Sequence, residues 1–348
     1  MLFGTAYYPE HRAPSRWEHD LKLMQEAGIR AARVGEFAWC RMEPADGMTD
    51  FSWLDEFAEL ATRHDIRLLV CPPMRTVPAW LLEQDPSMAI LDEDGIRLDY
   101  GSRYSFCINN ALLRRKGLAL AEALARHFAG NPAVVGWHLD NEYGDDPPCH
   151  CDACRAAFHR WLEDRYDTPE ALNRAWGLVF WGLEVGDFSQ LPTPARTKTR
   201  WNPAHMLAWR RFRSDTTVEL VRLHAEAVRR GDPEAYITTN FQGLYQFKTD
   251  FHKALPHIDV PGTNYYPRFD GGHPCTAHDG YQTLQLDLQR TMGDGRFQML
   301  ELRSGPHGVP GRGGPAPGQI ENVTLQVQAH GAEAAYYFRW RIVPFGPE

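Results

Sequence analysis

Apolar and polar positions alternate along the chain in two periods, one typical of strands and one typical of helices. Short apolar runs recur, and most are followed by a longer segment whose apolar residues fall on one helical face. The short runs predict strands at 2–8, 31–37, 67–71, 133–139, 235–240, 258–266 (interrupted by Pro261-Gly262), 297–302 and 334–340. The helical faces predict helices at 17–27, 53–64, 112–128, 152–166, 206–230, 281–292 and 321–331.

This alternation predicts a parallel α/β sheet, and eight strands predict closure into a (β/α)₈ TIM barrel. The competing fold is a doubly wound open sheet, which usually has a Gly-rich phosphate turn after its first strand. The corresponding turn here, residues 8–11, contains no glycine. We therefore expect one catalytic barrel domain over residues 1–348, with a helical insertion at about 145–231. Only residues 341–348 follow the eighth strand, so the last barrel helix is expected to be absent.

Composition excludes several classes of function. Hydrophobic residues make up 43% and charged residues 24% of the chain, as in ordinary globular proteins. The formal net charge of −8 argues against a nucleic-acid-binding protein, which usually needs a basic face. No apolar run approaches the roughly 20 residues of a membrane span. The N-terminus lacks the basic and long apolar segments of a signal peptide, so we expect a cytoplasmic protein.

Two acidic residues stand at the ends of predicted strands, where a barrel performs its chemistry. Glu142 follows the strand at 133–139, and Glu301 lies near the end of the strand at 297–302. The carboxyl ends of barrel strands meet at one mouth, so the fold would bring the two acids together. Paired carboxylates suit glycosidic bond cleavage, in which one protonates the leaving oxygen and the other attacks the anomeric carbon. For Glu301 alone, a salt bridge to Arg303 or another arginine is the alternative.

A cysteine cluster makes a separate case. Cys149, Cys151 and Cys154 lie close together, and Cys107 sits in the irregular segment after the third predicted strand. Four thiolates can close a tetrahedral Zn²⁺ site, whose role would be structural because a closed site leaves no position for water. Four free thiols are the alternative, and His150 is an alternative ligand. The metal would hold the segment after the third strand beside the loop that carries Glu142.

Several motifs, in order along the whole chain, resemble those of one family. Asn141-Glu142 together with Glu301 is similar to the retaining (β/α)₈ glycosidases. The stretch 140–144, followed by Cys-x-Cys-x-x-Cys, resembles glycoside hydrolase family 42, the β-galactosidases. Further stretches that resemble this family are residues 3–10, 36–39, 180–182, 264–267 and 337–341.

The resemblance implies a retaining exo-glycosidase that hydrolyses terminal β-D-galactosides, as oligosaccharides or simple glycosides, by double displacement. It implies that Glu142 is the acid/base and Glu301 the nucleophile. The positions that match sugar-holding residues are Arg103, Asn141, Trp181, Tyr266 and Glu348. Glu348 is also the last residue of the chain, where a solvated, frayed end is the alternative. The positions that match zinc ligands are Cys107, Cys149, Cys151 and Cys154.

The chain departs from the family pattern in two respects. The family usually has Pro-Gly shortly after the nucleophile and a Trp in the following loop. At these positions this chain has the sequence Leu302-Arg303-Ser304-Gly305-Pro306, and it has no Trp between Glu301 and Trp340. The family also continues into a trimer-forming domain and a small β domain, so a homotrimer is expected only of a longer parent. These departures motivate an alternative, a non-catalytic sugar-binding barrel or inactive fragment of a longer glycosidase. A zinc hydrolase is a third hypothesis and requires an open metal position.

Overall fold

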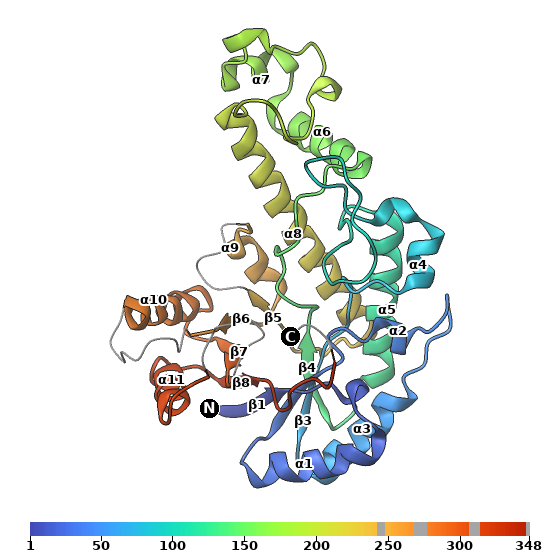
Figure 1. Ribbon diagram of the computed structural model, residues 1–348, viewed down its shortest axis with the longest axis vertical. Helices are drawn as coiled ribbons and strands as arrows, with labels where there is room; N and C mark the ends of the chain where they lie inside the picture. Colours follow the sequence, from blue (N-terminus) through green and yellow to red (C-terminus); the bar gives the residue numbers. More distant parts are fainter. Residues whose placement is uncertain (242–247, 268–276, 306–313, 346–348) are drawn as a thin grey trace.

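The computed structural model describes residues 1–241, 248–267, 277–305 and 314–345, and its strands form a closed barrel (Figure 1). Each strand pairs in parallel with the next one in sequence, and the eighth pairs in parallel with the first. The strands are β1 (Leu2–Ala6), β2 (Ala31–Val34), β3 (Arg67–Val70), β4 (Val134–His138), β5 (Ile237–Phe241), β6 (Val260–Tyr265), β7 (Gln298–Arg303) and β8 (Ala334–Phe338). The predicted eight-stranded parallel barrel is therefore confirmed.

Helices alternate with the strands and surround the barrel (Figure 1). The longer helices outside the insertion are α1 (Trp17–Glu26), α3 (Ser52–Arg63), α5 (Ala111–Phe128), α10 (Ala277–Met292) and α11 (Gln319–Ala329). Short helices that the periodicity does not predict are α2 (Trp39–Met42), α4 (Ala79–Gln84) and α9 (Phe251–Ala254). In the described part of the chain, no helix follows β8, and no helix is both long and apolar enough to span a membrane.

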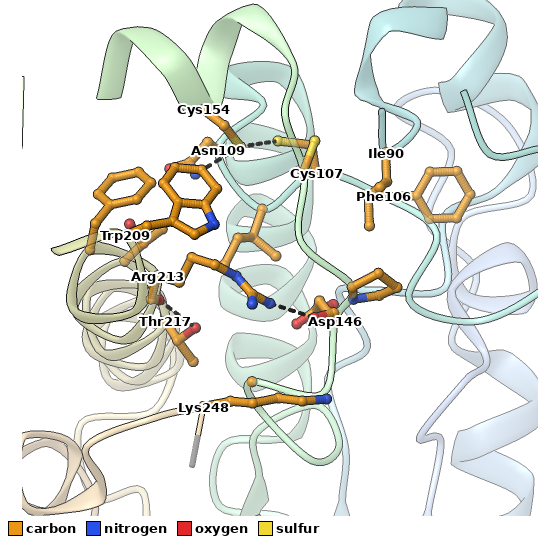
Figure 2. A pocket seen from close by; sticks show the side chains of 16 residues that line it. Ile90, Phe106, Cys107, Asn109, Asp146, Cys154, Trp209, Arg213, Thr217 and Lys248 are labelled. Carbon is orange, nitrogen blue, oxygen red and sulfur yellow. Dashed lines mark hydrogen bonds between the residues drawn. The ribbon is translucent and has the colours of Figure 1, made fainter. Parts of the chain in front are cut away.

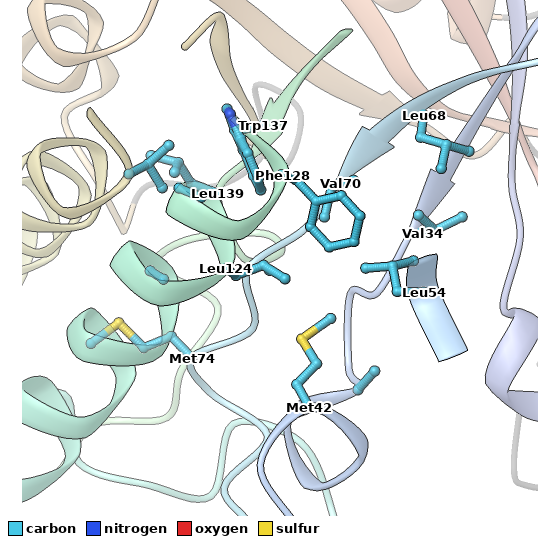
Figure 3. Packing of buried hydrophobic residues seen from close by; sticks show 14 of the residues in the cluster. Val34, Met42, Leu54, Leu68, Val70, Met74, Leu124, Phe128, Trp137 and Leu139 are labelled. Carbon is cyan, nitrogen blue, oxygen red and sulfur yellow. The ribbon is translucent and has the colours of Figure 1, made fainter. Parts of the chain in front are cut away.

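The main core lies between β2–β4 and the helices that cover them (Figure 3). Val34 and Val70 from the strands are fully buried, as are Leu54 from α3 and Leu124 from α5. Burying a side chain of this size contributes roughly 1.5–3 kcal/mol each. The side chain of Asn110 caps α5 by accepting a hydrogen bond from the Leu113 N–H at 2.9 Å, which fixes where the helix begins. This packing provides a rigid base for the barrel mouth.

Strand β6 is continuous through Pro261, where the sequence predicts an interruption. Pro261 pairs with Thr239 of β5, and Gly262 lies against Leu300 of β7. A Cβ atom at Gly262 would lie only 2.1 Å from Leu300 Cδ1, so glycine allows the two strands and their side chains to approach closely. Gly262 therefore lets β6 lie close to β7, the strand that carries Glu301.

Helices α6 (Asp152–Tyr166), α7 (Pro169–Trp176) and the first half of α8 (Pro203–Gly231) project away from the barrel (Figure 1). They share a second core, in which the Phe158 ring meets Trp209 edge-on with centroids 5.1 Å apart. The second half of α8 packs along α5 at the barrel. These helices occupy the segment predicted as a helical insertion, and its assignment to a single domain with the barrel stays a prediction.

Candidate active site

The two predicted carboxylates lie at the carboxyl ends of β4 and β7. Glu142 is 8% exposed and Glu301 is 3% exposed, so both acids are largely removed from water. The pairing of β7 with both neighbouring strands is irregular near Glu301. Its pairing with β6 shifts register between Thr263 and Asn264, and its pairing with β8 shifts register between Met299 and Leu302. Such irregularities change the direction in which a side chain points and are common next to active sites. The local strand geometry therefore turns Glu301 toward the barrel mouth.

Two asparagines connect the carboxylates. Asn240, at the end of β5, donates from Nδ2 to Glu301 Oε1 at 2.9 Å and accepts the Glu142 backbone N–H at 2.9 Å. Asn264, at the end of β6, donates from Nδ2 to Glu142 Oε1 at 2.8 Å. The strands between β4 and β7 thus hold both acids within one hydrogen-bonded network. Sequence reasoning missed both roles, although Asn240 ends a predicted strand and Asn264 lies near the end of the next one, which is the signal that marks such positions in a barrel.

A buried arginine supplies the positive charge beside Glu301. Arg33 of β2 donates from Nη2 to Glu301 Oε1 at 2.7 Å and to Glu36 Oε2 at 2.9 Å. Burial acts to lower the pKa of Arg33, but the charges of Glu36 and Glu301 outweigh it and hold that pKa well above its usual value. Arg33 is therefore a permanent cation in this site. The salt bridge considered for Glu301 alone is therefore present, with Arg33 as the other arginine, while Arg303 donates to the carbonyl oxygens of residues 267 and 305.

Two tyrosines complete the surroundings of these acids. Tyr266, directly after β6, donates its hydroxyl proton to Glu301 Oε2, and Tyr8, after β1, donates to Glu36 Oε2 at 2.7 Å. Burial and the nearby charges of Glu301 and Glu142 raise the pKa of Tyr266 well above its usual value, so its hydroxyl remains a proton donor. Burial also raises the pKa of Glu36 to about 7, against the opposing charge of Arg33. Tyr266 and Arg33 each bind a different oxygen of the Glu301 carboxyl group.

The remaining predicted sugar contacts lie in different places. Asn141 belongs to the central network, since its Oδ1 accepts from Asn240 Nδ2 at 2.5 Å and its Nδ2 donates to Tyr104 Oη at 2.7 Å. Arg103 is half-buried and stacks over Tyr104, with its guanidinium carbon 5.0 Å from the ring centroid. It lines a cleft of about 580 Å³ together with Tyr8. Because Tyr8 binds Glu36, the cleft opens beside the network that holds Glu301.

Trp181 lies elsewhere, in the segment that follows α7 on the projecting insertion (Figure 1). It is 66% exposed and lines a separate cavity of about 640 Å³ with Phe180 and Trp201. Neither Glu142 nor Glu301 lines this cavity, so this chain does not bring Trp181 together with its own pair of acids. Glu348 lies outside the described residues. The assignment of both residues to sugar binding stays a prediction.

The four predicted zinc ligands do come together, and Figure 2 labels two of them, Cys107 and Cys154. The sulfur atoms of Cys107, Cys149, Cys151 and Cys154 all lie within 4.8 Å of one another, and all four residues are buried. Buried thiols at this spacing fit a tetrahedral metal ion such as Zn²⁺. His150 is not part of the cluster, because its ring stacks on Trp209 and its Nδ1 lies 3.0 Å from Thr193 Oγ1.

Comparisons with known proteins agree with this geometry. The profile of glycoside hydrolase family 42, described as beta-galactosidase, matches residues 6–348. A beta-galactosidase from Thermus thermophilus is 36% identical over 361 residues, covering 100% of this chain and 56% of that protein. The crystal structure of beta-galactosidase from the psychrophilic Marinomonas ef1 superposes with a TM-score of 0.93 at 34% identity, covering 100% of this chain and 55% of the other.

A third relative is known as a solved structure of a catalytic mutant. A GH42 beta-galactosidase from G. stearothermophilus, solved as a catalytic mutant, superposes with a TM-score of 0.92 at 29% identity, covering 99% of this chain and 52% of the other. The chain thus spans about half the length of the relatives it matches. The match to the family profile over nearly every residue, with these relatives, shows that the chain belongs to glycoside hydrolase family 42, the β-galactosidases.

Proposed function

We propose that this chain carries the active site of a retaining exo-glycosidase that hydrolyses terminal β-D-galactosides by double displacement. One observation carries the proposal: Glu142 and Glu301, from the ends of β4 and β7, are tied together through Asn240. Two carboxylates held over one barrel mouth are the minimal machinery for glycoside hydrolysis. The choice of galactose as the sugar rests on family membership, because the curated relative from Thermus thermophilus is named a beta-galactosidase.

In the first step, a carboxylate oxygen of Glu301 attacks the anomeric carbon while the protonated carboxyl of Glu142 gives its proton to the departing glycosidic oxygen. The C–O bond to the leaving group breaks and a galactosyl ester of Glu301 forms. In the second step, the Glu142 carboxylate takes a proton from water, the resulting hydroxyl oxygen attacks the anomeric carbon, and Glu301 leaves as a carboxylate. Each step inverts the anomeric centre, so the overall reaction retains its configuration.

Different neighbouring residues hold each of the two acids in position. Arg33 and Tyr266 bind separate oxygens of Glu301, which fixes the plane of that carboxyl group for attack. Asn264 binds an oxygen of Glu142 and orients it toward the glycosidic bond. Asn141 and Arg103 are proposed to bind galactose hydroxyls, with Arg103 acting from the wall of the 580 Å³ cleft. Trp181 and Glu348 are proposed as further sugar contacts on the strength of the family resemblance alone.

The cysteine cluster is proposed to hold one structural Zn²⁺ through Cys107, Cys149, Cys151 and Cys154. When bound, the metal would cross-link the segment after β3 to the loop after β4 and take no part in the reaction. We further propose a cytoplasmic protein that acts on soluble galactosides, with trimer formation reserved for a longer parent chain. Neither a nucleic acid nor a membrane has a role in this proposal.

The test is nucleophile rescue. Glu301→Ala should lower turnover of a nitrophenyl β-galactoside by at least about 10⁴-fold, as expected for loss of a covalent catalyst. Azide should restore part of that turnover and give α-galactosyl azide, because the small anion attacks in place of the missing carboxylate. Glu142→Ala should instead yield β-galactosyl azide. Glu18→Ala, at an exposed position on α1, is the matched control and should have wild-type activity. An active Glu301→Ala protein would overturn the proposal.

A further inference from the structure

Arg75 occupies a buried position beside the turn that carries Glu142. Its side chain is 1% exposed and donates two hydrogen bonds, from Nε to Asp140 Oδ2 and from Nη1 to Asp146 Oδ2, each at 2.7 Å. Asp140 directly follows Leu139 at the end of β4, and Asp146 lies six positions further along the chain. One guanidinium group from the segment after β3 therefore binds both ends of the turn.

Aromatic rings hold this guanidinium group in place. Its central carbon lies 4.5 Å from the ring centroid of Tyr104 and 4.8 Å from that of Tyr143. The Tyr104 hydroxyl accepts a hydrogen bond from Asn141, and the Tyr143 hydroxyl lies 2.6 Å from Nδ1 of His224 in α8. The contacts of Arg75 thus extend to the residues on both sides of Glu142. A planar group is required here, because an ammonium group cannot bind two carboxylates in a fork and stack on rings at the same time.

The turn itself needs external support. Asp140 and Glu142 have φ angles of +45° and +46°, in the left-handed region that costs a residue with a side chain roughly 1–2 kcal/mol each. Gly144 follows with φ of +89°, where a Cβ would lie 2.2 Å from Thr249 Oγ1. Such a conformation persists only when the surrounding contacts determine it. Arg75 binds one strained residue, Asp140, directly, and Glu142 and Gly144 lie between Asp140 and the second aspartate that it binds, Asp146.

The far end of the turn has its own anchors (Figure 2). Arg213 of α8 donates from Nη2 to the backbone oxygen of Asp146 at 2.7 Å, and Lys248 lies 2.9 Å from Asp145 Oδ1. Arg213 thus binds the outer end of the turn to α8, and Lys248 binds it to the segment that precedes α9. The inner end, at Asp140, depends on Arg75, whose charge opposes the rise in the Asp140 pKa that burial causes.

We propose that Arg75 is a positioning residue for Glu142: by binding Asp140 and Asp146 it closes the left-handed turn and places the Glu142 carboxyl for proton transfer, without touching the substrate. This inference rests on the proposed role of Glu142 as acid/base. An ammonium group in place of the guanidinium could not bind both buried carboxylates in the same way, and the turn would open to hydrate the one left unbound. Glu301 would be unaffected, because Arg33, Asn240 and Tyr266 hold it from other strands.

The test compares leaving groups. A 2,4-dinitrophenolate departs without protonation, whereas a phenolate needs the acid. For Arg75→Lys we expect kcat/KM on phenyl β-galactoside to fall by about 10²-fold, the scale of general acid catalysis. On dinitrophenyl β-galactoside we expect kcat/KM to stay within about threefold of wild type, since general acid assistance is not needed there. Azide should raise the turnover of dinitrophenyl β-galactoside by this variant and yield β-galactosyl azide.

Three comparison variants make the result decisive. Glu142→Gln should show the same dependence on leaving group in stronger form, and Leu21→Ala, in the core of α1, should lower stability without any such dependence. Asp146→Asn removes one half of the contact and serves if Arg75→Lys does not fold. Equal losses on both substrates in the Arg75 variant, beside a normal Glu142→Gln result, would overturn only the positioning role. Absence of leaving-group dependence in Glu142→Gln would overturn the acid/base assignment and this inference with it.

Discussion

The side-chain amide of Asn240 donates a hydrogen bond to Oε1 of Glu301 over 2.9 Å. The other end of the same amide accepts the backbone N–H of Glu142, so one residue sets the position of both acids. Retaining glycosidases place their carboxyl groups about 5–5.5 Å apart, a separation with little tolerance. A rigid link between the strands that carry the acids is a direct way to maintain it.

Asn240→Ala should therefore impair both halves of the mechanism. Glu301 loses a hydrogen-bond donor and the Glu142 backbone loses its acceptor, so kcat/KM should fall by about 10²-fold, whichever leaving group is used. Steady-state kinetics on phenyl and dinitrophenyl β-galactosides measures this. Asn173→Ala removes a buried amide of α7 in the insertion and should keep wild-type kinetics. A loss confined to phenyl β-galactoside would contradict the dual role of Asn240.

Arg33→Met should shift the pH dependence of the reaction as well as its rate. Without the guanidinium group, Glu36 and Glu301 face each other with no countercharge, and the pKa of Glu36, which Arg33 now holds down against burial, rises further. The acidic limb of the kcat/KM profile should move to higher pH, and the maximum should fall by at least about 10²-fold. Rates measured from pH 4 to 9 test this, with the exposed-site variant Arg63→Met as control. An unchanged acidic limb would show that Arg33 does not control this ionisation.

Loss of one cysteine of the cluster should lower stability far more than activity. Cys151→Ser removes one sulfur of the proposed zinc site, so the zinc content should fall to zero and the melting temperature should fall by at least about 5 °C. Metal analysis and calorimetry report these two quantities, and activity at 20 °C should be largely retained. Cys40→Ser, an exposed thiol outside the cluster, is the control. A wild-type protein that is free of metal and keeps its melting temperature in chelator would rule out a structural metal.

Glu10, in the short helical turn Pro9–His11, should make stability depend on pH. Burial raises its pKa from 4.5 to about 7, against weaker opposing effects of its own backbone N–H and Arg41. Between these values the folded protein holds a proton that the unfolded chain releases, so the free energy of unfolding falls as pH rises. Glu10→Gln removes this loss.

The Glu10→Gln variant should be more stable than wild type at pH 8, by about 1–3 kcal/mol. At pH 4.5 the difference should be smaller, because the wild-type carboxyl is then protonated in the folded state. Denaturant unfolding at a series of pH values measures this, with Glu18→Gln on the surface as control. A stability difference that does not vary with pH would mean that Glu10 is not the responsible group.

The barrel was predictable because most strands contain a short run of buried, largely apolar residues, and such runs alternate with helical faces. The residues at which the strands end were not predictable. The run at 31–37 predicts a strand to its last residue, but β2 ends at Val34, and Glu36 leaves the sheet to meet Arg33 and Tyr8. Periodicity reports burial, and Glu36 is buried without being part of the sheet. The short helices α2, α4 and α9 span too few turns to show a period.

The site was predictable where position along a strand carries the information. Glu142 follows β4 and Glu301 lies near the end of β7, so barrel topology brings both to one mouth. Arg33 was not predictable as the partner of Glu301, because this pairing spans 268 positions and exists only across the barrel interior. For Trp181, the sequence motif was recognisable but the position in the fold was not. A local motif marks it as a sugar contact, but its position depends on how the insertion projects, which no local pattern encodes.

The pairing of β1 with β8 joins the first and last parts of the chain, and Arg33 reaches Glu301 across the interior of the closed ring. Contacts this distant in sequence form late, because a long loop must be ordered before they contribute. A chain whose ring is still open has both carboxylates but lacks the cation that neutralises Glu301. During refolding, hydrolysis of a chromogenic galactoside should therefore appear only as the ring closes, which makes the reaction a clock for the final step of folding.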